Sequence, residues 1–265
     1  MRKIVVCIKP VPDPTHWGRM KMDEGSGTLK REGIPIIMNP LDKHAIEASL
    51  VLREERGGEI VLISMAPSSA VSILREGLAM GADRAVLLAD PLFAGSDTLA
   101  TARVLAAGCR FIQDVDLIFV GNQSIDSATG QICSQLGELL GLPSVMHVIG
   151  LESENKGGMI VTQKIEGGYA RLRAGIPIVL ALRREVNKPR HIPFSGILAS
   201  ERKEIRVLSS TDLDMAPGLV GLEGSPTKMA GVETRRLERP CERVKGSARE
   251  IAEIITARIH EYGII

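Results

Sequence analysis

The sequence is poor in aromatic residues, carries almost no net charge and has no long hydrophobic run. Aromatic residues make up 3% of its 265 positions, so platforms for stacking nucleic-acid bases are not expected. The formal net charge is +1, which argues against nucleic acid or an anionic membrane as the main partner. No apolar run is long enough to cross a bilayer. The composition is that of a soluble globular protein.

The cysteines and histidines show no spacing typical of a functional site, and common catalytic motifs are absent. The four cysteines, Cys7, Cys109, Cys133 and Cys241, lie far apart and form no Cys-x-x-Cys pair. With no signal peptide ahead of Met1, we expect reduced thiols in a cytoplasmic chain. The five histidines lack metal-ligand spacing, and Gly-x-Ser-x-Gly, His-Glu-x-x-His and Walker motifs are absent. The sequence therefore predicts no catalytic residue and no metal site, and Cys7 is interpreted as a buried residue rather than a nucleophile.

What the sequence does contain is an alternation of apolar runs of strand length with helical patterns. The expected strands are residues 3–8, 59–65, 84–88 and 117–120. The expected helices are residues 40–56, 66–80, 97–112 and a segment that follows Gln131. Such alternation is typical of βαβ units and predicts an α/β fold, a doubly wound and mostly parallel sheet.

The second half of the chain changes character. Residues 159–165 and 169–173 flank Glu166-Gly167-Gly168 and predict a hairpin, and residues 178–182 a further buried strand. Shorter hairpin arms are expected at residues 21–23 and 28–30. From residue 187 the sequence predicts a long arm. The chain is therefore expected to consist of a body, residues 1–186, and an arm, residues 187–265. Ser247 and Glu250 form a capping-box pattern that starts a last helix, which either folds back or docks on another chain.

Four loops, residues 39–42, 65–69, 93–98 and 121–131, follow strands or precede helices on the edge where parallel strands have their carboxyl ends. Asn39 is expected to cap a helix that begins at Pro40, and Asp97 and Thr98 open another. Ser124, Ser127, Thr129 and Gly130 are small enough to let a phosphate approach the main chain, and Asp126 either caps the next helix or binds a ribose hydroxyl. Several helix N-termini on one edge predict a nucleotide phosphate site. The alternative is that these residues are ordinary helix caps.

The residues of these loops resemble a known family. The segments that carry the resemblance are Val5-Val6-Cys7-Ile8-Lys9, Asn39-Pro40, Leu78-Ala79-Met80-Gly81-Ala82-Asp83, Gly121-x-Gln123-x-Ile125-Asp126 with Thr129-x-Gln131, Glu166-Gly167-Gly168-Tyr169, Asn187-x-Pro189-Arg190 and Gly224-Ser225-Pro226-Thr227. Together they are similar to the β subunit of electron transfer flavoprotein (ETF β, FixA family), over nearly the whole chain. The resemblance implies a Rossmann-like body of the adenine nucleotide alpha hydrolase type and an ETF α subunit as heterodimer partner. It also implies an electron carrier without catalytic residues of its own.

The resemblance implies a nucleotide site at the predicted loops. Its residues are Cys7, Asn39, Pro40, Leu41, Asp42, Met65, Gly121, Asn122, Gln123, Ser124, Ile125, Asp126, Ser127, Ala128, Thr129, Gly130, Gln131 and Ile132, to which the loop pattern adds Asp97 and Thr98. The family holds AMP in this site in its common form, and a second FAD in its electron-bifurcating form. Residues 30–35, 63–65 and 89–101 resemble the bifurcating form, so FAD is favoured over AMP. Bifurcating relatives usually read Asp-Gly-Asp-Thr where this chain has Asp126-Ser127-Ala128-Thr129.

The resemblance also implies partners. A bifurcating ETF takes electrons from NADH and exchanges them with a flavin-containing dehydrogenase and with ferredoxin or flavodoxin. The dehydrogenase docks on a loop after the Asn-x-Pro-Arg motif, where Phe194 falls at the position of the apolar anchor. The alternative is that Phe194 packs on its own subunit. Two other functions stay open at this point: a non-bifurcating ETF β subunit with structural AMP, and an adenine-nucleotide-binding regulator of stress-protein type.

Overall fold

The computed structural model describes residues 1–19, 21–22, 29–30, 33–154, 158–228 and 241–264. The chain forms two compact units, Met1–Ala230 and Gly231–Ile265. The first unit is built on one large sheet, and the second contains the last helix. Each unit is described by itself.

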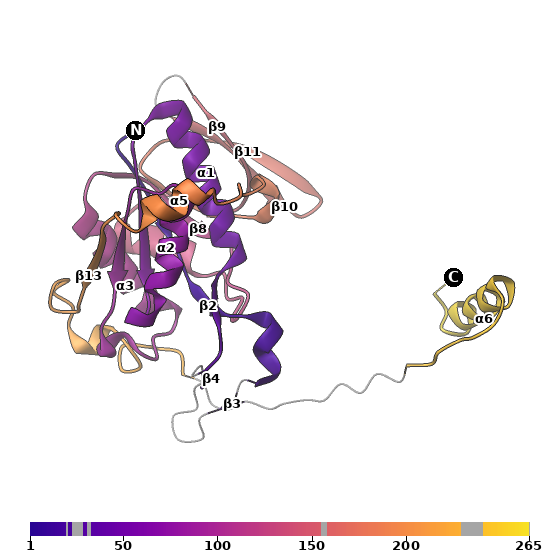
Figure 1. The fold of residues 1–265 in the computed structure, drawn as a ribbon. Coiled ribbons are helices and arrows are strands. Elements are labelled where there is room, and N and C mark those ends of the chain that lie inside the picture. The colour runs from indigo at the N-terminus through magenta and orange to yellow at the C-terminus, as the bar shows by residue number, and fades with distance from the viewer. Residues whose placement is uncertain (20, 23–28, 31–32, 155–157, 229–240, 265) are drawn as a thin grey trace. The chain divides into compact units, whose positions relative to one another are not determined.

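Nine strands of the described residues form the sheet of the first unit (Figure 1). Their order across the sheet is β11 (Gly168–Ala174), β10 (Met159–Ile165), β9 (Ser144–Ser153), β12 (Ile178–Leu182), β8 (Val115–Gly121), β1 (Lys3–Cys7), β6 (Glu59–Met65), β7 (Arg84–Leu88) and β13 (Ile205–Leu208). Every neighbouring pair from β9 to β13 is parallel, and β10 pairs antiparallel with β9 and β11. The predicted mostly parallel sheet and the predicted hairpin are confirmed.

Helices cover both faces of this sheet, because the central strands are apolar on both sides. On one face α1 (Pro40–Arg56) and α2 (Val71–Met80) pack on alternate strand residues such as Val6 and Leu62. On the other face α3 (Thr98–Ile112) and α4 (Ile132–Leu140) pack on the intervening residues, such as Val5 and Ile63. The doubly wound α/β architecture predicted from the sequence is confirmed.

Shorter elements complete the first unit. The 3-10 helices are η1 (Pro14–Arg19), η2 (Ser68–Ala70), η3 (Pro91–Phe93), η4 (Arg184–Val186) and η5 (Pro217–Leu219). Two small antiparallel ladders pair β2 (Pro10–Pro12) with β5 (Ile36–Met38), and β3 (Lys21–Met22) with β4 (Leu29–Lys30). The last pair confirms the hairpin arms expected near residues 21 and 30; Asp23 and Thr28 lie outside the described residues.

The direction in which strands are added reverses between β1 and β8. From β1 the chain adds β6 and then β7 on one side, and then returns to place β8 on the other side of β1. In an open parallel sheet, a ligand site lies outside the carboxyl ends of the strands at such a reversal. These ends are Cys7 of β1 and Gly121 of β8. The fold therefore singles out the loop that follows Gly121, which is one of the four loops predicted from the sequence.

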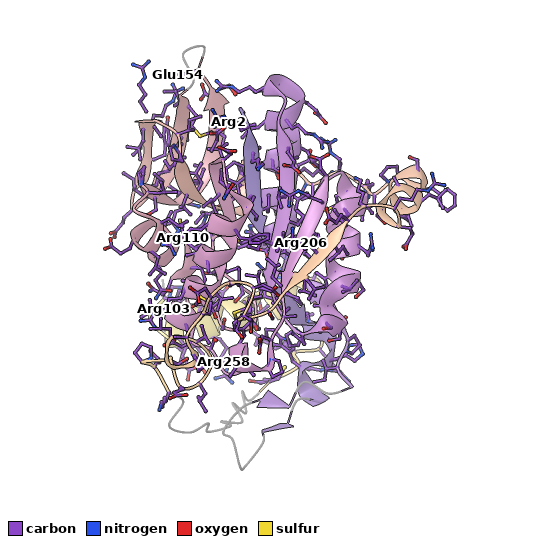
Figure 2. All side chains as sticks on the ribbon, turned by 90° about the vertical axis from the view of Figure 1, so that its left-hand side faces the viewer. Arg2, Arg103, Arg110, Glu154, Arg206 and Arg258 are labelled. Atoms are coloured by element: carbon purple, nitrogen blue, oxygen red, sulfur yellow. The ribbon has the colours of Figure 1, made fainter. Side chains whose placement is uncertain are left out.

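Part of the segment that the sequence analysis treated as an arm belongs to the first unit. The helix α5 (Phe194–Ser200) lies against α2, and β13 pairs with β7 at the edge of the sheet (Figure 1). Arg206 of β13 lies over the ring of Phe111 in α3, 4.7 Å from its centroid (Figure 2). A four-residue strand has too short a pattern to be recognised without its neighbour. The division of roles at residue 187 stays a prediction.

The second unit contains α6 (Ala248–Glu261), which begins at the predicted capping box. The backbone N–H of Ser247 donates to Glu250 Oε2 at 2.8 Å, and the Glu250 N–H donates to Ser247 Oγ at 3.4 Å. Ile254 and Ile255 are exposed on this helix. Among the described residues, no helix has the length and apolar character that crossing a membrane requires.

Candidate functional site

Asp42 in the first turn of α1 joins the carboxyl ends of β1 and β8. Its carboxylate accepts the backbone N–H of Lys9 at 2.7 Å and the side-chain amide of Asn39 at 2.8 Å, and it also accepts the N–H of Gly121. Asp42 is 3% exposed. Burial raises the pKa of Asp42 to about 7, against the opposing effect of these N–H donors and of the Lys9 charge. The carboxylate therefore fixes the geometry of the strand ends from behind the loop.

Asn39 connects the same point to the loop after β8. Its amide donates to the carbonyl of Gln123 at 3.1 Å and accepts the N–H of Ile125 at 3.2 Å, besides donating to Asp42. Asn39 occupies the N-cap position of α1, as predicted, but its side chain makes no capping hydrogen bond. The expectation of a side-chain cap was wrong because the amide is used on the loop and on Asp42.

Lys9 binds three side chains of the loop that follows β8. Its ammonium donates to Asp126 Oδ1 at 2.6 Å and to the hydroxyls of Ser124 and Ser127 at 3.1 Å each. Asp126 does not cap the following helix, because the residue before α4 is Gln131 and Asp126 is paired with Lys9. That alternative was wrong; the ribose contact of Asp126 stays a prediction.

The tip of the loop is exposed, and it is closed by a hydrogen bond from the Ala128 N–H to the Ser124 carbonyl at 2.9 Å. Residues 127–129 are exposed, and Ala128 and Gly130 have positive φ values of 52° and 65°. Gln131 supplies no side-chain hydrogen bond to the first amides of α4 within the described residues. Free amides at a helix N-terminus and a loop with left-handed residues form a site suited to an anion such as a phosphate.

Ala128 allows a direct test of the loop conformation. A left-handed conformation costs an L-residue about 1–2 kcal/mol, whereas glycine adopts it freely. We expect Ala128→Gly to raise the free energy of unfolding by roughly 0.5–1 kcal/mol, after the greater entropy of glycine in the unfolded chain is subtracted. Urea denaturation measures this change. Ala128→Val is the matched variant and should lower stability, because a β-branched side chain is strained at positive φ.

Three other predicted residues lie on the sheet face covered by α3 and α4, whereas Pro40 and Leu41 belong to the first turn of α1 on the other face. Cys7, Met65 and Ile132 all belong to or pack on the hydrophobic cluster of this face. Gln135 of α4 donates to Thr98 Oγ1 at 3.1 Å, which links the starts of α3 and α4. Burial, followed by the nearby Cys109 thiol, raises the pKa of Cys7 well above its usual value, so Cys7 is protonated near neutral pH. These facts agree with the interpretation of Cys7 as a buried residue.

Asp97 is used within the chain. Its Oδ1 accepts the N–H of Ala100 at 2.9 Å as the N-cap of α3, and its Oδ2 accepts the N–H of Thr227 at 2.9 Å. Its own N–H donates to Ser225 Oγ at 2.8 Å. Burial opposes ionisation, but the N–H donors hold the pKa of Asp97 below its usual value. Asp97 therefore anchors the segment of Ser225 and Thr227 beside the start of α3, and its contact with a ligand stays a prediction.

Sequence reasoning did not include Lys9 among the site residues, and it named Asn122 without predicting the contacts by which it supports the loop. Lys9 was part of a family motif without a role, although a lysine directly after a buried strand is a recognisable signal. Asn122 donates its N–H to the Leu182 carbonyl at 2.9 Å, and its Oδ1 accepts the N–H of His147 at 3.0 Å. His147 lies where the ladder between β9 and β12 shifts register and has a φ of 57°. No sequence pattern predicted this irregular strand.

Phe194 lies at the start of α5, outside the loop of residues 121–131. Its side chain is 74% exposed, and the neighbouring Ile197 and Leu198 are 48% and 57% exposed. The three side chains form a small apolar group on a seven-residue helix, which we call the α5 apolar group. Its exposure leaves the α5 apolar group available to another protein.

Comparison with known proteins gives the family. The electron transfer flavoprotein domain family matches residues 26–213. The chain is 39% identical over 263 residues to the electron transfer flavoprotein subunit beta of Thermoanaerobacterium thermosaccharolyticum, covering 99% of both chains. It is 37% identical over 265 residues to the caffeyl-CoA reductase-Etf complex subunit CarD of Acetobacterium woodii, covering 99% of this chain and 100% of the other. The chain therefore belongs to the electron transfer flavoprotein β subunit family.

Proposed function

We propose that this chain is the β subunit of a heterodimeric, electron-bifurcating electron transfer flavoprotein that binds FAD at the β1–β8 strand ends. An ETF α subunit is its partner and carries a second flavin. The observation that carries the nucleotide site is the reversal of strand order between β1 and β8, with the loop of residues 121–131 at that point.

The residues present fit a dinucleotide. The exposed loop tip, residues 127–129, and the uncapped amides at the start of α4 would hold its phosphates. Lys9, Asn39 and Asp42 lie behind the loop and hold it in place. When bound, the flavin supplies the exchange of electron pairs for single electrons, which no side chain of this chain supplies. The role of the protein is to bind, orient and shield the cofactor.

FAD is favoured over AMP by two observations. The full-length similarity to CarD relates this chain to a subunit of a reductase-Etf complex. Residues 30–35, 63–65 and 89–101 resemble the bifurcating form, and residues 63–65 and 89–101 include the end of β6 and the start of α3, which border the site. The Ser127-Ala128 pair departs from that form, but the site depends on main-chain donors that this change leaves in place. AMP in a non-bifurcating carrier is the second candidate.

Nucleotide analysis of the purified heterodimer with its α subunit tests this proposal. We expect two FAD for each heterodimer and no AMP. One FAD and one AMP would contradict the bifurcating form and support the non-bifurcating carrier. If this chain instead formed a monodisperse homodimer that binds ATP without an α subunit, the ETF function itself would be wrong. The cytoplasmic location stays a prediction.

We further propose that the α5 apolar group docks a flavin-containing dehydrogenase. Exposed aromatic side chains are frequent hot spots of protein interfaces, and their truncation costs about 2 kcal/mol or more. Phe194→Ala should therefore raise the KM of the dehydrogenase for the heterodimer by roughly 30-fold and leave kcat unchanged. The measurement uses an acyl-CoA dehydrogenase as probe and the heterodimer as varied substrate. Val207→Ala, an exposed side chain on β13, is the control; equal KM values for Phe194→Ala and wild type would contradict docking at α5.

A further inference from the structure

The segment that leads into α5 is held on α1 by the side chains of five residues. His44 Nδ1 lies 3.1 Å from the Asn187 carbonyl and 3.0 Å from Asn187 Oδ1, and both are acceptors, so Nδ1 carries the proton. The Asn187 side-chain amide donates to the His44 carbonyl at 2.9 Å. Three residues further on, Arg190 pairs with Glu47 and Glu54. We call Glu47 and Arg190 the α5 clasp.

The geometry of the α5 clasp is that of a forked pair. Arg190 donates from Nη2 to Glu47 Oε1 at 3.0 Å and from Nε to Glu47 Oε2 at 2.9 Å, and its backbone N–H also reaches Oε2 at 3.0 Å. The remaining nitrogen Nη1 donates to Glu54 Oε1 at 2.8 Å. Hydrogen bonding to Glu47 raises the pKa of Arg190, and hydrogen bonding to Arg190 lowers the pKa of Glu54. Both charges of the clasp are therefore held in place by several bonds each.

Glu47 is 6% exposed, which is unusual for a carboxylate on a helix. Its charge is matched by Arg190 alone among the ion pairs of the described residues. The side chain of Arg190 is 36% exposed and can turn toward water. Loss of Arg190 therefore leaves a buried charge without a partner, whereas loss of Glu47 does not.

The far end of α5 is held by α2. Gly196 lies so close to the Ala79 carbonyl that a Cβ atom there would clash with it. Arg75 donates to the carbonyls of Ser200 and Lys203, and Lys203 Nζ donates to the Leu78 carbonyl at 3.0 Å. This end is therefore fixed independently of the clasp.

We propose that Glu47 and Arg190 are positioning residues for docking, and that they hold α5 so that the α5 apolar group faces a partner in one orientation. The proposal rests on the docking role proposed above for α5. A helix of seven residues is too short to be stable by itself, so its order must come from its attachments. An ordered helix binds a partner without the entropy cost of ordering it on contact.

Amide hydrogen exchange of the purified full chain tests the clasp without any partner. In Arg190→Gln we expect residues 194–200 to exchange roughly 30-fold faster, because Glu47 is left buried and charged. In the double variant E47Q/R190Q the increase should be clearly smaller, because the two neutral amides can pair. In Arg190→Lys the increase in exchange rate should be intermediate, because lysine keeps the charge but cannot form two parallel hydrogen bonds to Glu47. Exchange in β1 and β6 should not change.

Two results would overturn the proposal. One is exchange of residues 194–200 in Arg190→Gln at the wild-type rate. The other is an equal increase in β1 and β6, because the pair would then stabilise the whole body rather than α5. The control is Arg171→Gln on the hairpin, which breaks the ion pair with Glu152, where both partners are more than half exposed. This variant should leave exchange in α5 unchanged.

The dehydrogenase assay then separates this proposal from the docking proposal. Arg190→Gln should raise KM for the heterodimer by roughly 10-fold at unchanged kcat, and Phe194→Ala should have less effect in the Arg190→Gln background than in wild type, because both act through α5. If Phe194→Ala alone has no effect on KM, docking at α5 is wrong, while hydrogen exchange still decides the role of the clasp. Full additivity of the two substitutions would contradict positioning through α5.

Discussion

Gly121→Ala is expected to abolish nucleotide binding and to lower the free energy of unfolding by about 3 kcal/mol. A Cβ atom at position 121 would clash with Asp42 Oδ1 and lie 3.0 Å from Leu41 Cβ. Neither neighbour can move, because Asp42 is tied to Lys9 and Asn39 by hydrogen bonds of 2.7 and 2.8 Å. The substitution would therefore separate the ends of β1 and β8, on which the nucleotide loop depends.

Urea denaturation and nucleotide analysis of the purified variant measure these two effects. The matched control is Gly175→Ala, where an added Cβ meets no atom within 4 Å. This control should keep wild-type nucleotide content and lose at most a few tenths of a kcal/mol. A Gly121→Ala variant with full nucleotide content would contradict the location of the site at the β1–β8 strand ends.

Asp42→Asn is expected to change the pH dependence of stability between about pH 5 and pH 7. The pKa of Asp42 is about 7 in the folded chain and 3.8 is its ordinary value, so the folded state keeps a proton that the unfolded state loses. Stability therefore falls as pH rises through this window, and the contribution levels off above pH 7. Asparagine does not titrate, so the variant should gain about 2–3 kcal/mol relative to wild type between pH 5 and pH 7.

Urea denaturation of both proteins at pH 5, 6, 7 and 8 gives the difference in unfolding free energy at each pH. The control is Asp90→Asn, because hydrogen bonds from the Ser210 side chain and the Leu92 N–H lower the pKa of Asp90, so that it titrates below this window. A constant difference for Asp42→Asn from pH 5 to pH 8 would mean that Lys9, Asn39 and Gly121 keep the carboxylate ionised throughout, and would contradict the raised pKa.

One helix supports both proposed interaction sites. The first turn of α1 holds the nucleotide loop through Asn39 and Asp42. The next turns hold the approach to α5 through His44, Glu47 and Glu54. A displacement of α1 would therefore affect both sites.

The local spacing of apolar residues was sufficient to predict most helices and strands of the body. The expected strands 59–65, 84–88 and 178–182 have the bounds of β6, β7 and β12. These strands are apolar along their length because helices or neighbouring strands bury both faces, and glycines mark their boundaries. The capping box of α6 was equally readable, because a helix start depends on residues three apart in sequence.

Contacts between distant residues could not be predicted in this way. β13 is a strand only because β7 offers it a parallel edge, and the register shift of β9 depends on Asn122 and His147. The side chain of Asn39 was expected to cap α1, but the loop after β8 competes for the same amide. In each case the two partners are far apart in sequence, so no local periodicity indicates their contact.

The sequence by itself determined the α/β class, the elements of the body and the set of loops that resemble the ETF β nucleotide site, because strand and helix formation follow from the spacing of apolar residues. Only the tertiary structure decided which of these residues are exposed at the loop tip and which hold the loop from behind. Asp42 and Asn39 are buried supports, and residues 127–129 are the exposed tip. The physical reason is that burial and hydrogen-bond partners depend on where β1, β8 and α1 meet, and that meeting point exists only in the folded chain.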